Sequence, residues 1–253
     1  MLLLVLLLTI SNFPFLAGLK VLLLFFRVIY MKVLRTCLLT GLLLTMVGAQ
    51  AGVVVGGTRL VYDGAKKESS INVNNPDETP YLIQSWVESQ SNSSTANIPF
   101  IITPPLFRLD GEQQNVLRVV KVGNLPEDHE SLYWLNVKSI PSGKQMENTL
   151  QIAVRTRIKL IYRPSALKNS VPEDQTDKLI WTKDGNQLRL KNPTPYYMNF
   201  NEISVGGKKL DNVTYIPPGD TITFTLPNKD NVVKWKIISD YGSIGPVHES
   251  NIN

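Results

Sequence analysis

The sequence predicts an all-β protein built from two immunoglobulin-like β-sandwich domains. Short segments in which apolar and polar residues alternate recur at spacings near ten residues, and clusters of Gly, Pro, Asn and Asp separate them. No amphipathic pattern of helical period extends beyond a turn or two. Many short strands without long helices are typical of sandwiches and barrels. We expect the two sandwiches to meet near Pro164.

Each expected strand is a short apolar or alternating run bounded by turn residues. The Thr103-Pro104-Pro105 run interrupts one of them, which is typical of an edge strand or of a crossover between sheets, because proline cannot donate to the ladder. Asp184-Gly185 predicts a hairpin. The expected strands comprise residues 58–62, 70–73, 81–88, 99–109, 116–122 and 132–139 in the first domain, and 179–182, 187–190, 196–205, 221–226 and 231–238 in the second.

The stretch from Leu150 to Pro164 has the most informative pattern of the chain. Its alternation over ten residues predicts a half-buried strand that is longer than the usual five or six residues and ends at Pro164. The apolar set of the alternation comprises Leu150, Ile152, Val154, Ile158 and Leu160, and the polar set comprises Gln151, Arg155, Arg157 and Lys159.

Two interpretations of this strand are open. In the first, the apolar set is buried in the core of its own sandwich and the cations form a solvated face. In the second, the strand meets a partner. The four cations of the strand are Arg155, Arg157, Lys159 and Arg163, and a core strand rarely needs so many.

The first 51 residues differ in composition from the rest and resemble an export signal. A second segment within them has a basic start, an apolar run and an A-x-A site, which is the order found in signal peptides. These parts are Met31–Arg35, Cys37–Val47 and Ala49-Gln50-Ala51. We expect translation to start at Met31 and cleavage to follow Ala51. A membrane anchor is the alternative, and Pro14 and the short apolar runs argue against it.

Removal of residues 1–51 would change the charge of the chain. These residues hold four of the 26 Lys and Arg residues and none of the 21 acidic ones, so the mature chain would have a net charge of +1. No strong basic field would remain to indicate binding to nucleic acid. The single cysteine, Cys37, would be lost too. We therefore expect an exported protein stabilised by packing without disulfides, which about 200 residues can achieve.

The sequence offers little support for catalysis or metal binding. The two histidines, His129 and His248, lie in different expected domains and outside any motif with ligand spacing. No G-x-S-x-G or comparable nucleophile motif is present. We therefore expect neither an enzyme nor a cofactor, and the classes that remain are a binding module and a structural protein.

A set of short motifs in a fixed order resembles the periplasmic chaperones of the chaperone–usher pathway, which assemble bacterial pili. The resemblance extends from Gly57 to about Pro246, and the set is specific although each motif alone is weak. The motifs of the first domain are Thr58-Arg59, Tyr62-Asp63-Gly64, Ile102–Pro105, Arg108-Leu109, Glu130–Leu132, Ile140-Pro141, Leu150–Ala153, Ile158–Leu160 and Tyr162–Pro164. Those of the second domain are Asn192–Tyr197 and Asp240–Gly242.

The resemblance implies a fold and a mode of action. It implies two sandwiches in an L or boomerang arrangement, with residues 1–51 removed, an N-terminal domain over 52–166, a linker over 167–177 and a C-terminal domain over 178–253. It also implies donation of a strand to an incomplete pilus subunit through main-chain pairing. The donor residues would be Leu150, Ile152, Val154 and Ile158.

The resemblance further assigns charged residues to two sites. Arg59 and Lys159 would hold the C-terminal carboxylate of the subunit in the cleft between the domains, since a desolvated carboxylate needs charge-assisted donors. Glu130, Arg163 and Asp240 would form a buried ion network that orients the domains; the alternative is three unrelated surface charges. Lys159 and Leu150 have opposite parity, so a bulge or strong twist would be needed to direct both at one partner.

The expected partners follow from the same resemblance. They are pilus subunits and an outer-membrane usher, with no nucleic acid, no metal and no membrane insertion of the mature chain; a second copy of the chain could also cap the exposed strand. The protein would act in the periplasm without ATP. A structural pilus subunit or adhesin is the alternative function, but such a subunit would be a single incomplete domain with its own N-terminal donor segment.

Overall fold

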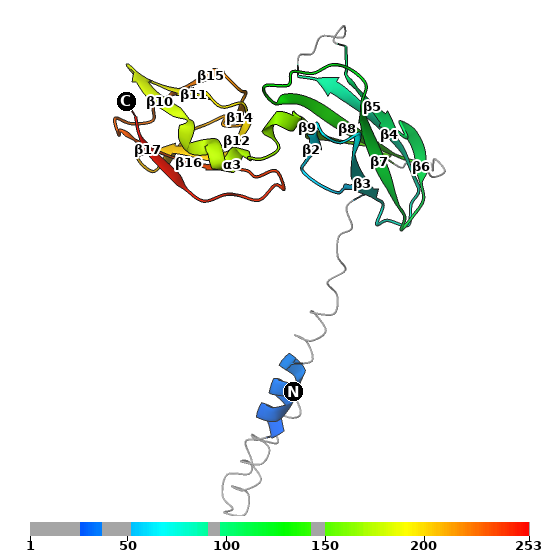
Figure 1. Cartoon of the computed structure of the whole chain (residues 1–253). Helices are drawn as coiled ribbons and strands as arrows, with labels where there is room; N and C mark the ends of the chain where they lie inside the picture. The colour runs from blue at the N-terminus through cyan, green and yellow to red at the C-terminus, as the bar shows by residue number, and fades with distance from the viewer. Residues whose placement is uncertain (1–25, 37–51, 91–96, 143–149, 253) are drawn as a thin grey trace, which may run out of the picture. The chain divides into compact units, whose positions relative to one another are not determined.

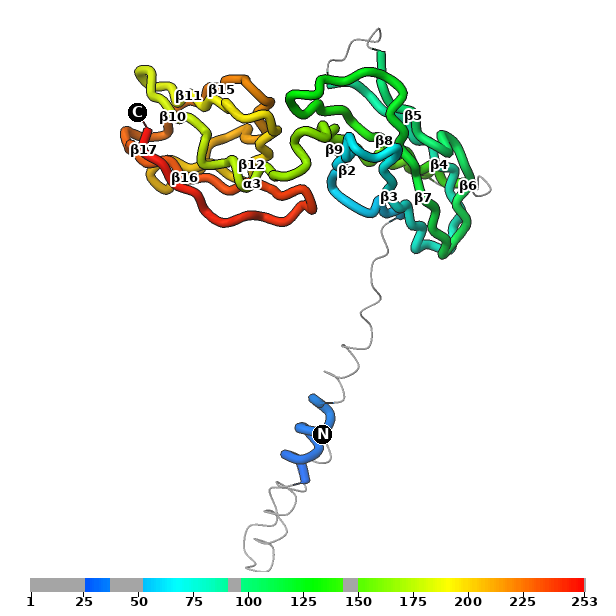
Figure 2. The backbone as a smooth tube through the Cα atoms, in the orientation of Figure 1, coloured from blue at the N-terminus to red at the C-terminus, as the bar shows by residue number. Residues whose placement is uncertain are grey.

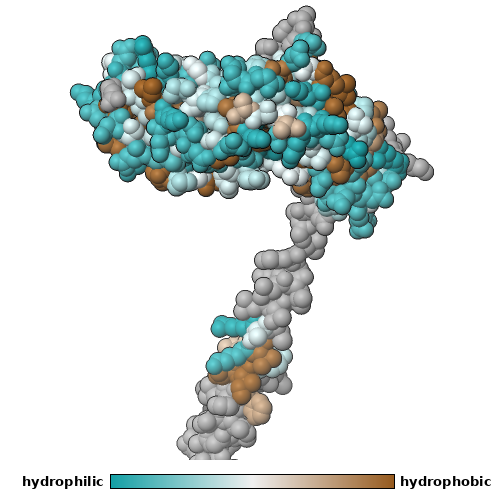
Figure 3. Space-filling view, in the orientation of Figure 1, coloured by the Kyte–Doolittle hydropathy of each residue, from teal (hydrophilic) through white to brown (hydrophobic). Residues whose placement is uncertain are grey.

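The computed structural model describes residues 26–36, 52–90, 97–142 and 150–252 (Figures 1 and 2). The chain divides into a unit of residues 1–50 and a larger one of residues 51–253. In the first unit, residues 26–36 form an exposed helix with apolar side chains on its surface (Figure 3). Among the described residues, no helix has the length and apolar character needed to cross a membrane. The expected apolar run Cys37–Val47 and the cleavage site at Ala49–Ala51 lie outside the described residues.

The first part of the larger unit is a sandwich of two sheets (Figure 1). One sheet has the order β1-β3-β7-β5, and its pairs are antiparallel. The other has the order β2-β9-β8-β4-β6, in which β2 runs parallel to β9. The strands are β1 (Val54–Val55), β2 (Arg59–Asp63), β3 (Glu68–Asn74), β4 (Tyr81–Ser89), β5 (Phe100–Thr103), β6 (Leu106–Leu109), β7 (Gln114–Lys121), β8 (Ser131–Pro141) and β9 (Val154–Arg163).

Alternating side chains from both sheets form the core of this sandwich. Tyr62, Leu117, Leu135 and Leu160 are fully buried, and Tyr62 packs its ring 5.5 Å from that of Phe100. Burying each such side chain stabilises the fold by about 1.5–3 kcal/mol. Of β9, the core therefore contains every second residue around Leu160, which are Ile158, Leu160 and Tyr162.

The second part is a smaller sandwich. Its sheets have the orders β10-β11-β15 and β13-β12-β16-β17, with β14 paired to β12. The rings of Trp181 and Trp235 lie 5.1 Å apart at the centre of its core. The strands are β10 (Ile180–Asp184), β11 (Gln187–Lys191), β12 (Met198–Val205), β13 (Lys208–Lys209), β14 (Tyr215–Ile216), β15 (Thr221–Thr225), β16 (Val232–Ile237) and β17 (His248–Asn251).

The segment between the sandwiches contains short helical turns where the sequence predicts only a linker. They are η1 (Ser165–Leu167), α3 (Pro172–Gln175) and η2 (Thr176–Lys178). The Thr176 hydroxyl accepts a hydrogen bond of 2.9 Å from the Trp235 indole N–H. This contact fixes the end of the segment to the core of the second sandwich, and Figure 2 follows the chain through it from β9 to β10.

Every long expected strand is present, and the differences concern its limits and the shortest strands. The crossover at Thr103-Pro104-Pro105 is confirmed, because β5 and β6 on either side of it belong to different sheets. The Thr103–Pro104 peptide bond is cis. The expected hairpin at Asp184-Gly185 joins β10 to β11. Four short strands, β1, β13, β14 and β17, were not predicted, since two to four residues carry no measurable alternation.

The start of the long strand is a correction. The alternation predicts a strand from Leu150, whereas β9 begins at Val154, and residues 150–153 have no strand partner among the described residues. Val154 pairs with Ser139 of β8, only two residues before β8 ends. A strand forms only where a neighbouring strand accepts its hydrogen bonds, and β8 has almost no length left beyond this point.

Candidate functional site

The N-terminal half of β9 has a free edge. On one side, β8 pairs with the residues of β9 from Val154 to Tyr162. On the other side β2 pairs only with residues from Lys159 to Arg163. Residues 154–158 therefore have no partner on that side within the described parts of the chain, and they present unpaired backbone groups that could pair with another strand.

Apolar side chains continue from this edge into the preceding residues. Leu150, Ile152 and Val154 are 83%, 62% and 52% exposed. Ile158, which shares their parity, is only 6% exposed and belongs to the core of the first sandwich. The inclusion of Ile158 among the residues offered to a partner is therefore wrong for this structure, because its side chain packs in the core of the sandwich although β2 pairs with β9 only from Lys159 onward.

Both interpretations of the alternating strand hold, in different parts of it. From Ile158 onward the apolar parity is core, as the first interpretation requires. Before Ile158 the same parity is exposed beside an unpaired edge, as the second requires. The change occurs between Val154 and Ile158, just before β2 begins to pair with β9 at Lys159, so the tertiary structure decides it and the alternation does not.

Two cations lie side by side where β2 and β9 meet. Arg59 and Lys159 are Cα partners in the parallel ladder. Arg59 donates from Nη1 to the carbonyl oxygen of Ile238 over 3.2 Å, and its Nε is buried without a partner in the described chain. Neither cation is within ion-pair distance of a carboxylate among the described residues. A half-buried cation pair without a counter-ion favours binding of an anion.

The surroundings of Lys159 come from the second sandwich. Its ammonium donates to the Asn199 side-chain oxygen and lies 4.5 Å from the centre of the Tyr215 ring. Burial and the neighbouring Arg59 lower the pKa of Lys159 to about 8. Burial also lowers the pKa of Arg59, which Asp240 and Glu173 partly oppose. Each cation thus lacks the full solvation that it would have in water, and a bound carboxylate would supply the missing partner.

Glu130, Arg163 and Asp240 meet between the sandwiches. Arg163 donates from Nε to Glu130 over 2.7 Å, and from Nη1 and Nη2 to the two oxygens of Asp240 over 2.6 and 2.9 Å. The second oxygen of Glu130 accepts the backbone N–H of Tyr197 over 2.7 Å. The three charges are therefore one network and not unrelated surface groups. It joins the residue just before β8, the last residue of β9 and the segment after β16.

The pKa values in this network reflect burial and pairing. Burial raises the pKa of Glu130 to about 7, while Arg163 and the Tyr197 N–H oppose the rise. The two carboxylates raise the pKa of Arg163 against its own burial, so this guanidinium stays charged. A buried network of this kind is weak evidence for stability.

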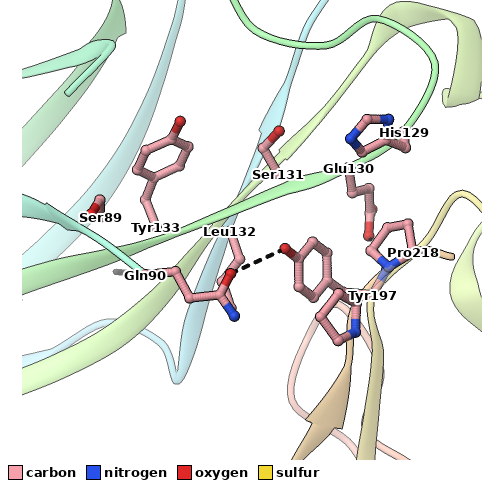
Figure 4. A pocket seen from close by; sticks show the side chains of 10 residues that line it. Ser89, Gln90, His129, Glu130, Ser131, Leu132, Tyr133, Tyr197 and Pro218 are labelled. Carbon is pink, nitrogen blue, oxygen red and sulfur yellow. Dashed lines mark hydrogen bonds between the residues drawn. The ribbon is translucent and has the colours of Figure 1, made fainter. Parts of the chain in front are cut away.

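A hollow of about 530 Å³ lies next to this network (Figure 4). The end of β4, the start of β8, and Tyr197, Pro217 and Pro218 of the second sandwich line it. The Tyr197 hydroxyl donates to the side-chain oxygen of Gln90 over 3.4 Å across it. The hollow contains neither Arg59 nor Lys159. Among the described residues, no cluster of three or more His, Cys, Asp or Glu could hold a metal ion.

Sequence reasoning missed the residues that complete the site from other strands. Asn199 and Tyr215 contact Lys159, and Glu88 contacts Arg155. None of these three belongs to a motif that singles it out. Their roles depend on contacts across 40 or more residues of sequence, which a strand pattern does not report.

The fold and site define a protein of two β-sandwiches with a free apolar strand edge beside a half-buried cation pair. The family models match two ranges of the chain. Residues 52–168 match the pili and flagellar-assembly chaperone, PapD N-terminal domain, and residues 174–248 match the pili assembly chaperone PapD, C-terminal domain. The chain belongs to this family of pilus-assembly chaperones. Membership implies a non-enzymatic role, and it does not favour a structural pilus subunit.

Similar proteins agree with this assignment. The probable fimbrial chaperone LpfB of Escherichia coli O157:H7 is 43% identical over 80% of this chain and 89% of its own length. The chaperone protein FimC of Escherichia coli K12 is 41% identical over 83% of this chain and 90% of its own length. A solved structure, the Salmonella enterica SafA pilin in complex with the SafB chaperone, matches with a TM-score of 0.73 and 35% identity, covering 81% of this chain and 99% of the matched chain.

Proposed function

We propose that this chain binds pilus subunits in the periplasm by lending them the free edge of β9. The observation that supports this most directly is the combination of an unpaired backbone edge at residues 154–158 with exposed Leu150, Ile152 and Val154. A subunit that lacks one strand of its sandwich would pair with this edge and bury these side chains in its groove. Pairing of this kind is driven by hydrogen bonds and apolar burial and needs neither ATP nor a cofactor.

The cation pair would fix the register of the bound subunit. Arg59 and Lys159 lie at the end of the free edge, where β2 begins to pair with β9. A C-terminal carboxylate placed between them would receive charge-assisted hydrogen bonds in a partly desolvated site. The strand order supports this role, because the anchor residue Lys159 directly follows the last residue of the free edge.

The Glu130, Arg163 and Asp240 network would hold the sandwiches so that Asn199 and Tyr215 stay beside Lys159. Arg163 and Lys159 are both on β9, and Asn199 and Tyr215 belong to the second sandwich. A change of orientation between the sandwiches would therefore alter the anchor. We also propose that an outer-membrane usher accepts the loaded complex, and that a second copy of the chain can cap the edge when no subunit is present.

The proposed domain boundaries complete this picture. Residues 1–51 would be a signal region that is removed in export, residues 52–166 the domain with the donor edge, residues 167–177 a linker and residues 178–253 the second domain. The two family matches and the positions of the strands support these limits.

Formation of a subunit complex tests the function. We expect this chain, expressed with pilus subunits of the same organism and exported, to yield a soluble 1:1 complex in size-exclusion chromatography, with a chaperone that begins at Gly52 in mass spectrometry. Subunits expressed without the chain are expected to aggregate, because their groove exposes core residues. Equal recovery of soluble subunits with and without the chain would contradict the function, and a membrane-bound chain that keeps residues 31–51 would contradict the processing.

A further inference from the structure

The polar side of β9 is attached across the sheet to two other strands. The Arg155 guanidinium donates from Nε and Nη2 to the side-chain oxygen of Asn136 on β8, over 2.9 and 2.7 Å. The same Nη2 donates to both oxygens of Glu88 on β4, over 2.7 and 2.6 Å. Arg155 thus connects β9 to β8 and β4 with one planar group, a geometry that arginine allows and lysine does not.

Aromatic rings support the same side. The guanidinium of Arg155 lies 5.0 Å from the centre of the Trp86 ring, and that of Arg157 lies 4.2 Å from the centre of the Trp134 ring. The Trp86 indole N–H donates to Glu88 over 2.8 Å, and Arg157 Nη2 is 3.8 Å from the same carboxylate. Contacts of cations with aromatic faces add to the ionic ones. One carboxylate, that of Glu88, is therefore common to both arginines and to one tryptophan.

These contacts lie on the part of β9 that has the free edge. Arg155 and Arg157 belong to residues 154–158, which only β8 pairs, and Val154 is the first residue of the strand. The end of a strand with one neighbour frays easily, since the free energy of opening is near zero at such positions. Exposed ion pairs usually contribute little to the stability of a fold. At residues 154–158, however, the ordered and the frayed states differ so little in free energy that a small contribution changes their populations.

The Glu88 carboxylate and both arginines lie on one face of the sheet. The side chains of Arg155, Arg157 and Glu88 project from the face opposite to the apolar core parity of β9. They leave the outward-facing backbone groups of the free edge unobstructed. The hydrogen bond from Trp86 and the charges and hydrogen bond of the arginines lower the pKa of Glu88 against the effect of its burial, with Arg157 acting only through its charge.

We propose that Glu88 is a positioning residue, which holds Arg155 and Arg157 across the sheet so that the free edge of β9 is already extended when a subunit strand arrives. The proposal rests on the proposed function, in which that edge is donated. Ordering the edge in advance removes an entropy loss from the binding step. Glu88 itself would not touch the subunit.

We call the contacts of Glu88 with Arg155 and Arg157 the brace. Hydrogen exchange in the free chain tests the brace without any subunit. Glu88→Gln keeps the size of the side chain and removes its charge. We expect the backbone amides of residues 154–158 that bond to β8 to exchange about tenfold faster, because hydrogen bonds to charged groups are replaced by neutral ones. Amides of β7, in the other sheet, should not change. Residues 154–158 should not change either in the matched charge control Glu78→Gln, whose exposed side chain lies in the loop before β4 begins at Tyr81.

Binding kinetics test the consequence, with the subunit that forms the 1:1 complex as the probe. Glu88→Gln should slow association about threefold to tenfold and leave dissociation unchanged within about twofold, since a fractionally ordered edge scales the association rate and not the final contacts. Arg155→Lys, which keeps the charge but cannot reach Asn136 and Glu88 together, should have the same effect. Glu88→Asp should recover part of the association rate.

Two results for Glu88→Gln would overturn the proposal. One is unchanged exchange at residues 154–158, and the other is an unchanged association rate. If dissociation were faster while association stayed unchanged, Glu88 would be in direct contact with the subunit. Ile152→Glu separates these results from a failure of the proposed function. If that variant binds like the unchanged chain, the donor edge itself is wrong, whereas the exchange experiment still reports on the brace.

Discussion

At the scale of single residues, the environment of Lys159 sets the pH range in which this side chain is charged. Its ammonium contacts Asn199 and Tyr215 and lies beside Arg59, and together with burial this neighbour lowers its pKa to about 8. The unfolded chain would have the ordinary lysine pKa near 10.4. The folded protein therefore loses this proton at a pH where most lysines keep it.

Subunit binding should depend on this proton. Below pH 8 Lys159 is charged and can bind a carboxylate, and as the pH rises through 8 it becomes neutral. We expect affinity for the subunit to fall about tenfold between pH 7 and pH 9, in proportion to the charged fraction. Titration calorimetry at several pH values measures this. Lys159→Arg, which stays charged, should abolish the dependence, and Lys159→Ala should bind weakly at every pH.

Stability should respond to the same proton with the opposite sign. Between pH 8 and about 10.4 the unfolded chain holds a proton on Lys159 that the folded chain has lost. The contribution of this residue to the free energy of unfolding therefore rises with pH over that window.

A binding affinity for the subunit that does not change between pH 7 and pH 9 would contradict the assignment of Lys159 to the anchor.

At the scale of elements, β9 has two functions along one alternating pattern. Its C-terminal half lies between β2 and β8 and contributes to the core, and its N-terminal half has a neighbour on one side only. The brace from Glu88 to Arg155 lies in the N-terminal half of β9. The physical difference between the halves is the presence of β2.

Ile158 of β9 and Ile152, which precedes the strand, provide a matched pair. Ile158→Glu places a charge in the core of the first sandwich, where Ile158 is 6% exposed. We expect the domain to lose well over 2 kcal/mol of stability, since a buried unpaired charge is costly. Ile152→Glu, at 62% exposure, should leave the thermal midpoint unchanged.

Subunit binding should separate the pair further. Ile152→Glu should abolish binding in a pull-down while the chain stays folded, because an apolar groove rejects a carboxylate. A midpoint lowered by about ten degrees in Ile152→Glu would mean that this residue is core. Normal binding by a folded Ile152→Glu would mean that the edge is not donated.

At the scale of the whole molecule, the two sandwiches are joined by charges and by a small apolar contact. Arg163 bonds to Glu130 and Asp240, and Leu132, Ile161 and Tyr197 form a separate buried cluster. Both features lie beside β9. The orientation of the second sandwich therefore bears directly on the anchor, through Asn199 and Tyr215.

Removal of one carboxylate tests this connection. Asp240→Asn takes away two charge-assisted hydrogen bonds from Arg163, and we expect a loss of about 1.5–3 kcal/mol in urea unfolding. Asp184→Asn, which breaks an exposed pair with Arg189 in the second sandwich, should cost less than about 1 kcal/mol. Subunit affinity should fall in Asp240→Asn and not in Asp184→Asn. Equal effects of the two changes would contradict a special role for the network.

The sequence alone determined the all-β class, the two sandwiches and nearly every long strand, because strand alternation and turn residues are local properties. It also singled out Arg59, Lys159, Glu130, Arg163 and Asp240, through motifs in a fixed order. The tertiary structure decided where β9 begins, that Ile158 is core while Ile152 is exposed, and that Glu88, Asn199 and Tyr215 complete the site. These features depend on which strand lies alongside another, and alternation has the same form whether a neighbour is present or absent.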